Sequence, residues 1–447
     1  MTGDDLDVAG RVLERAHAAG AEAVDVLVAS GVSSAVGVAG RALEEAERAE
    51  GRDLGLRVLV GRRQACVATS DDRDSAIREM AERAVAMARA APEDRWCGLA
   101  EPRQLGAVPD VAALELDDRA EFPEPAALEA RARAAEDAAL AVAGVTQVEQ
   151  ASASWTRDRI TIVQSNGFSG SYARSGIGVA CSAIAGEGPG RERDHAYEMR
   201  RHLDDLPDAE DIGRRAGQRA AERLHPRRPP AGRCPVLYDE RVAASLIGHV
   251  LSAINGAAVA RGASWLAESM ERQILPQGFD IVDDPLIPRG RASRPFDAEG
   301  LPAARLALIE DGVLRHWLLD LATARQLGLS GTARARRGVG GPPSPGPSNV
   351  RVTEGAADRA ALIREMGTGL LVTSMIGSSI NPTTGAYSRG ASGFWVEGGE
   401  IAYPVNEVTV AGSLPEMIRS LRPANDADPA KAVSVPSLLV EGATVGA

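Results

Sequence analysis

The chain has 447 residues, of which 44% are hydrophobic and 25% charged, a composition typical of a folded globular protein with two or three domains. Its formal net charge is −12, and no basic stripe with interleaved aromatic residues offsets it, which argues against nucleic-acid binding. No apolar run reaches the ~18 residues of a membrane span, and the acidic first residues lack the apolar core of a secretion signal. We therefore expect a cytoplasmic protein that does not bind membranes.

The first half of the chain predicts alternating helices and strands. Apolar residues at helical spacing predict helices over residues 5–19, 70–91, 125–143 and 206–224. Alternating or β-branched runs predict strands over residues 23–29, 33–39, 53–69 (with a turn at Gly61-Arg62), 145–154, 159–165 and 172–185. The sequence Asn166-Gly167 marks a tight turn before the last of these.

The second half predicts one long apolar helix over residues 240–259, followed by many short strands separated by glycine and proline. Asp311-Gly312 and Gly398-Gly399 mark hairpin turns. We expect an α+β protein with an N-terminal helix-and-sheet half and a mostly antiparallel β C-terminal half. The predicted domains are residues 1–224, which the Pro-rich connector at 92–123 divides into two subdomains in one interpretation, and residues 233–447.

The usual catalytic motifs are absent from the sequence. No two histidines are three to five residues apart, no C-x-x-C pair occurs, and neither a G-x-S-x-G elbow nor a phosphate-binding P-loop is present. The four cysteines are widely separated, and we expect buried reduced thiols. A zinc site assembled from distant residues stays open as an alternative. The histidines are His17, His195, His202, His225, His249 and His316.

Seven segments of the second half follow one another in a specific order, namely Ser245–Leu266, Gln273–Pro276, Ser293–Gly300, Asp311-Gly312, Gly385–Gly390, Gly393–Glu397 and Tyr403–Glu407. In this order they resemble the TldD/PmbA family, and in particular its PmbA/TldE branch. The first half agrees in length and layout. The resemblance implies the family's α+β fold over the whole chain.

In this family the TldD-like subunit holds zinc with a helical H-E-x-x-x-H motif and a cysteine near its C-terminus. When the helix is aligned through the following Arg-Gly-Ala-Ser stretch, the two histidine positions fall on Gly248 and Ala253, and the glutamate position falls on His249. The segment around 431–435 holds no cysteine. The resemblance therefore implies no catalytic residue, metal ligand or cofactor in this chain, with zinc only in a catalytic partner.

The resemblance also implies a role as the non-catalytic subunit of a heteromeric zinc metallopeptidase that degrades or processes unfolded peptides. The expected partner is a TldD-like catalytic subunit, and we expect the isolated chain to be an inactive homodimer. Residues 381–393 are the predicted peptide groove or interface, with Asn381, Tyr387, Ser388 and Arg389 as candidates; a structural turn between strands is the alternative. Two other hypotheses stay open: a stand-alone hydrolase with an unrecognised site, and a protein-binding regulator of the gyrase-modulator type.

Overall fold

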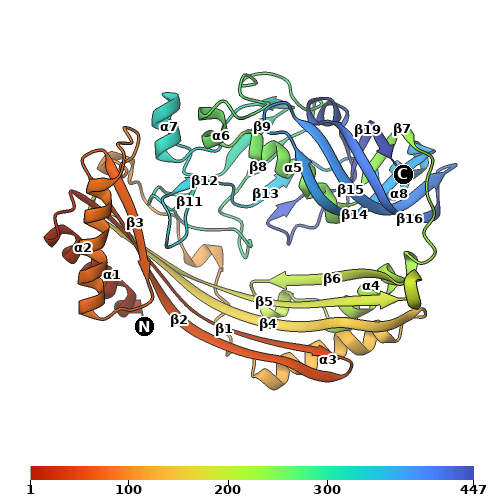
Figure 1. The fold of residues 1–447 in the computed structure, drawn as a ribbon, viewed down its shortest axis with the longest axis horizontal. Coiled ribbons are helices and arrows are strands. Elements are labelled where there is room, and N and C mark those ends of the chain that lie inside the picture. The colour runs from red at the N-terminus through yellow and green to blue at the C-terminus, as the bar shows by residue number, and fades with distance from the viewer. Residues whose placement is uncertain (1, 447) are drawn as a thin grey trace.

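The computed structural model describes residues 2–446. Figure 1 shows a long, curved sheet built from the first half of the chain, with the second half lying on its concave side. The predicted fold class is confirmed, because an N-terminal helix-and-sheet half is followed by a second half of mainly antiparallel strands that includes a barrel. Within residues 2–446, no helix is both long and apolar enough to cross a membrane.

The first sheet has six strands in the order β3-β2-β1-β4-β5-β6, and every neighbouring pair is antiparallel. The predicted turn at Gly61-Arg62 joins β2 to β3, where Val60 pairs with Arg63. The strands are β1 (Ala23–Ala39), β2 (Ala42–Val60), β3 (Arg63–Thr69), β4 (Val145–Gln164), β5 (Ser169–Ala185) and β6 (Glu192–Arg200).

Three of these strands are longer than the sequence predicted. We expected breaks within residues 23–39 and 145–165, yet β1 and β4 each run without interruption, and β2 begins at Ala42, well before the predicted start at residue 53. The small and polar residues 30–34 of β1 pair with β2 on one side and with β4 on the other. Pairing on both edges therefore keeps the chain extended where its own propensity for strand is weak.

Four helices cover the two ends of this sheet and create two separate apolar cores. Helices α1 (Thr2–Ala18) and α2 (Asp74–Ala90) enclose one core with β1, β2 and β3. Helices α3 (Pro125–Leu140) and α4 (Ala209–Glu222) enclose the other with β4, β5 and β6. These two helices touch at Gly213, where a Cβ atom would lie 1.9 Å from the Ala135 carbonyl oxygen. Only glycine permits so close an approach.

Five strands of the second half close into a barrel, in the order β16-β15-β14-β7-β19, because β19 pairs with β16. Only the β7–β14 pair is parallel among these described strands. Helix α5 (Glu240–Ala253) packs on the largest apolar core of the protein. The barrel strands are β7 (Gly232–Tyr238), β14 (Gly369–Ile380), β15 (Ala386–Glu397), β16 (Glu400–Ser413) and β19 (Leu438–Gly446), and β17 (Arg422–Pro423) extends the sheet.

Shorter elements connect the barrel to the first half. A five-stranded sheet has the order β10-β9-β8-β13-β18, and β11 pairs with β12. The strands are β8 (Ile281–Asp283), β9 (Leu306–Glu310), β10 (Val313–Leu314), β11 (Ala335–Arg336), β12 (Ser344–Pro345), β13 (Val350–Val352) and β18 (Val433–Ser434). The remaining helices are α6 (Gly256–Ala260), α7 (Leu321–Leu327), α8 (Arg359–Met366) and α9 (Leu414–Met417). Short 3-10 helices span Pro102–Gln104, Ala112–Leu114, Gly188–Gly190, Leu203–Asp205 and Ile418–Ser420.

The two halves meet where loops of the second half lie on the first sheet. At Gly55 of β2, a Cβ atom would come within 2.4 Å of the Val339 carbonyl oxygen, so the loop after β11 lies directly on the strand. Phe296 packs edge-on against Phe168, with ring centroids 5.0 Å apart. Asp25 of β1 forms an ion pair with Arg337, and both side chains are buried.

Candidate functional site

Helix α5 carries the positions that the family resemblance singled out. Asp239 caps the helix through its side chain, which accepts a hydrogen bond from the Arg241 backbone N–H. The predicted single helix over 240–259 is in fact two, because the chain leaves helical geometry at Ile254 and Asn255 then caps α6. The Asn255 side chain accepts from the Ala257 N–H at 3.0 Å and donates to the Pro345 carbonyl at 2.9 Å. These bonds compete with helix continuation.

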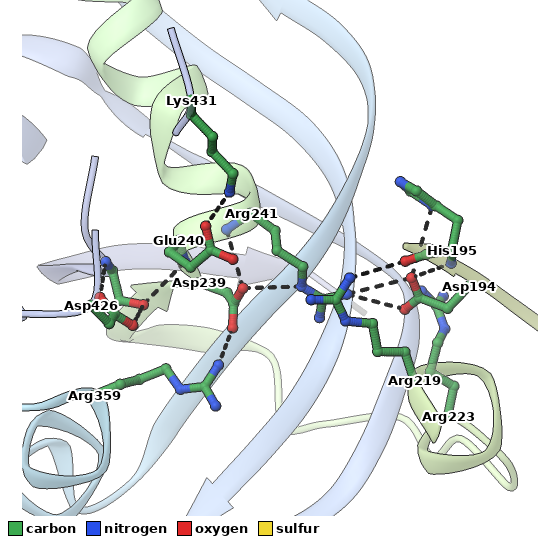
Figure 2. Close-up of polar contacts among 11 residues, drawn as sticks. Asp194, His195, Arg219, Arg223, Asp239, Glu240, Arg241, Arg359, Asp426 and Lys431 are labelled. Atoms are coloured by element: carbon green, nitrogen blue, oxygen red, sulfur yellow. Dashed lines mark hydrogen bonds and ion pairs between the residues drawn. The ribbon is translucent and has the colours of Figure 1, made fainter. Parts of the chain in front are cut away.

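The start of α5 lies in a network of charged side chains from both halves of the protein (Figure 2). Arg241 bonds to Asp239 at 3.0 Å and reaches Asp194 of β6 at 3.4 Å. Arg223, just beyond α4, lies 3.6 Å from Asp194. Arg359 at the start of α8 also pairs with Asp239. The network therefore joins β6, α4, α5 and α8.

Electrostatics at Asp239 favour its ionised form. Burial opposes ionisation, but Arg241 and Arg359 outweigh it and hold the pKa of the Asp239 carboxyl below its ordinary value. Beside it, Glu240 pairs with Lys431. The segment aligned with the family's C-terminal cysteine therefore begins beside α5, but it contributes an ammonium group there and no thiol.

The middle of α5 lies against two tyrosines of the barrel. The His249 ring lies edge-on to the Tyr387 ring, with centroids 5.8 Å apart, and the Tyr238 hydroxyl donates to the Tyr387 hydroxyl at 3.4 Å. Burial, and then the positive charge of Arg389, lower the pKa of His249. Its Nε2 atom is buried and has no hydrogen-bond partner among residues 2–446. At neutral pH this imidazole is thus uncharged and can still donate or accept one hydrogen bond.

The residues of α5 do not fit a zinc ion. A catalytic zinc needs about three ligating side chains. Gly248 has no side chain, and a Cβ atom built there would meet nothing within 4 Å. Ala253 is buried and carries only a methyl group. His249 is the one residue of the three with a ligating atom. Across residues 2–446, no three His, Cys, Asp or Glu side chains are grouped so that they could hold a metal ion.

The four predicted groove or interface residues lie on the β14–β15 hairpin but do not form one cluster. Asn381 lies in the exposed turn, where its side-chain oxygen accepts from the backbone N–H groups of Thr383 and Thr384 at 2.9 and 3.0 Å. Tyr387 is buried beside His249, and the Arg389 Nε donates to the Gly377 carbonyl at 2.8 Å. Ser388 is half-buried between Ser379 and Ala411 of the neighbouring strands.

Sequence reasoning missed the charged network and the tyrosine pair. The sequence predicts no strand between residues 185 and 206, yet Glu192–Arg200 form strand β6, in which the first alternate side chains are buried. Its buried positions are Glu192, Asp194 and Ala196, and because two of the three are acidic, the sequence shows no apolar alternation there. Tyr238 and Asp239 sit at a strand–helix junction, where a capping aspartate is common.

Comparison with known proteins agrees with this architecture. Residues 24–88, 114–224 and 231–447 match, in order, models of domain 1, the central domain and the C-terminal domain of the PmbA/TldA metallopeptidases. The metalloprotease PmbA of Escherichia coli O157:H7 is 35% identical over 82% of this chain and 79% of its own length. The PmbA homolog of Haemophilus influenzae is 34% identical over 96% of this chain and 93% of its own length.

Two solved structures share the fold. One, from Bacteroides thetaiotaomicron and named as a candidate modulator of DNA gyrase, has a TM-score of 0.91 and 24% identity over 99% of both chains. The other, TldE from Thermococcus kodakarensis, has a TM-score of 0.85 and 19% identity over 98% of this chain and 100% of its own. Fold and matched domains together define a protein of the metallopeptidase-like class. The chain belongs to the PmbA/TldD family, in its PmbA/TldE branch.

Proposed function

We propose that this chain is the non-catalytic subunit of a heteromeric zinc metallopeptidase, and that a TldD-like partner supplies the metal. The proposal rests on the residues of α5. Gly248 and Ala253 stand at the two positions that would have to bind zinc, and His249 stands at the position that would have to activate water. Without zinc there is neither a polarised carbonyl nor a water molecule of lowered pKa. The chain then contributes shape and binding surface.

The surface proposed for the partner is the β14–β15 hairpin. Ile376 of β14 is 77% exposed, the highest value among the exposed large hydrophobic residues described in the structure. It lies over Gly390 of β15, where a Cβ atom would come within 2.6 Å of its side chain. Burial of this side chain against a partner would remove its apolar surface from water. The proposed ligand of the assembled enzyme is an unfolded peptide held by strand addition, which reads the backbone rather than the sequence.

The proposal is tested by mixing the pure chain with a TldD-like subunit and measuring both complex formation and cleavage of an unfolded peptide. We expect a heterodimer that cleaves the peptide, and loss of cleavage when the TldD-like zinc is removed by a chelator. A well-folded chain that neither binds the TldD-like subunit nor changes its activity would contradict the proposal. Light scattering of the chain alone is expected to show a dimer at micromolar concentration.

Ile376→Glu tests the assigned surface. Burying a carboxylate at an interface is unfavourable, so we expect the affinity for the partner to fall roughly tenfold or more. Leu43→Glu on β2 is the matched control, because Leu43 is also exposed, at 48%, but lies on the first sheet. Analytical ultracentrifugation of the two mixtures measures the difference. Equal affinities of both variants would place the interface elsewhere.

A further inference from the structure

A cavity lies between the two halves, away from the α5 residues described above. It has a volume of about 260 Å³. Leu27 of β1, Ile160 and Ile162 of β4, and Tyr172 and Arg174 of β5 form its wall on the first sheet. The opposite wall consists of residues 291–294 and 296–298, the pair Arg336-Arg337, and Pro347.

Positive charge dominates this cavity, although the chain as a whole has a net charge of −12. Five arginines line it, against one acidic residue, Asp297. The Asp297 carboxylate is already engaged, because it accepts hydrogen bonds from the backbone N–H groups of Glu299, Leu301 and Ala335 at 2.9 to 3.0 Å. The lining arginines are Arg174, Arg291, Arg294, Arg336 and Arg337.

Several of these guanidinium groups have unused hydrogen-bond donors. The Arg337 side chain is only 1% exposed; one of its terminal nitrogens pairs with Asp25, but its Nε and Nη2 atoms are buried with no partner among residues 2–446. The Nε and Nη2 atoms of Arg294 are likewise buried and unpartnered within the described chain, while its Nη1 donates to the Ala335 carbonyl at 3.2 Å. Buried donors without acceptors are costly, so such groups usually mark a missing ligand or water.

A further arginine beside the cavity adds to the positive charge of this region. Arg201, which bonds to the Ser175 carbonyl at 2.7 Å, lies close by. Burial, and then the positive charges of Arg174 and Arg291, lower the pKa of Arg201 to about 10. Within residues 2–446, Arg291, Arg294 and Arg336 belong to none of the ion pairs found within 4.0 Å. The site therefore has positive charge to offer to a ligand.

We propose that this cavity binds the free C-terminal carboxylate of a peptide, with Arg294 and Arg337 as its principal ligands. A guanidinium fork matches the two oxygens of a carboxylate. The apolar wall of Leu27, Ile160 and Ile162 takes the side chain attached to that carboxylate, whereas a bare inorganic anion would leave this wall unused. Arg336 is exposed and stands at the mouth, where an extended chain can enter. The choice of a peptide as ligand rests on the proposed function.

The test is calorimetric titration of the full chain, without any partner, at low salt. The probe is an acetylated four-residue peptide of alanines ending in leucine, used with a free C-terminus and as its C-terminal amide. Inorganic phosphate is titrated in parallel. Because the lone chain is used, failure of peptide binding here is distinguishable from failure to assemble with a catalytic subunit or to support cleavage.

We expect the free acid to bind roughly 10- to 100-fold more tightly than the amide, the effect of one strong charge-assisted hydrogen-bonded pair. Arg294→Gln should remove that preference, while Arg48→Gln, which removes the same charge from exposed β2, should leave it unchanged. If Arg294→Gln fails to fold, Arg336→Gln at the exposed mouth and Arg294→Lys replace it, each with a smaller loss. Equal binding of acid and amide, binding of neither, or binding of phosphate with no preference for the acid would overturn the proposal.

Discussion

The two halves of the molecule bury their apolar residues in different ways. The first half spreads them over two cores, one at each end of a long sheet, and fills them with alanine, valine and leucine. The second half concentrates them in one large core between α5, the barrel and the short strands. Where the halves meet, a smaller apolar cluster that includes Phe168 and Phe296 lies beside buried ion pairs such as Asp25–Arg337 and Asp194–Arg241. Apolar burial thus builds each half, and buried charge adds to the apolar contact that joins them.

Among substitutions at the junction between the halves, we expect the largest loss of stability at Asp25. Its side chain is fully buried between Arg57 and Arg337, from β2 and from the second half respectively. Asp25→Asn would leave two buried guanidinium groups without a counter-charge, and we expect a loss of about 3–5 kcal/mol in the free energy of unfolding. Urea denaturation followed by circular dichroism measures it.

The exposed pair Arg15–Asp74 within the first half serves as the matched control. Asp74→Asn should cost less than about 1 kcal/mol, because water already solvates both partners. If Asp25→Asn were as mild as this control, the buried charge would contribute little to the stability of the contact between the halves.

The charged network at the start of α5 predicts a pH dependence. The folded-state pKa of Asp239 lies below its ordinary value, so its paired carboxylate stabilises the fold fully above the unfolded-state pKa of ~3.9. That contribution disappears as the pH falls through the folded-state pKa. Asp239→Asn keeps a good helix cap but removes the charge, and should cost roughly 1–3 kcal/mol at pH 7.

The same variant should approach the wild type in stability as the pH is lowered below about 4, because both then lack the charge at this position. Thermal melts at pH 7, 5 and 3 measure the convergence. A stability difference that stays constant over this range would show that Asp239 acts through packing or capping rather than through its ionised carboxylate.

We expect the smallest loss of stability from a substitution in the tyrosine pair beside His249. Tyr387→Phe removes the hydroxyl that accepts from Tyr238 and leaves a buried donor without its partner. We expect a loss of about 0.5–1.5 kcal/mol in chemical denaturation. Tyr197→Phe, at a position 54% exposed on β6, should change stability by less than this. A cost well above 2 kcal/mol for Tyr387→Phe would mean that this pair organises the barrel core.

Much of the regular structure could be predicted from the sequence. Apolar spacing located α1 to α5, and the turns at Gly61-Arg62 and Gly398-Gly399 located the hairpins after β2 and β15. The merged strands could not be predicted, since the small residues 30–34 stay extended only because β2 and β4 pair with them. Strand β6 was missed because it buries Asp194, whose charge Arg223 and Arg241 offset from other elements.

Some residues of the candidate site could also be predicted from the sequence, and others could not. The resemblance placed Gly248, His249 and Ala253 on one helix, which the structure confirms. No local pattern could show that Tyr387 would pack on His249, 138 positions earlier in the chain. The arginine-lined cavity is harder still, because Arg174, Arg294 and Arg337 come from a strand of the first half and from two loops of the second. Such sites depend on contacts between distant segments, which short-range patterns do not encode.

The zinc content of the isolated chain tests most directly whether this subunit is non-catalytic. It is measured by mass spectrometry after purification without chelator and is paired with an assay on an unfolded peptide. We predict far less than one zinc per chain and no cleavage, because Gly248 and Ala253 offer no ligating atom beside His249. One zinc per chain together with cleavage that a chelator abolishes would contradict this prediction, and would show that this subunit has a metal site of its own.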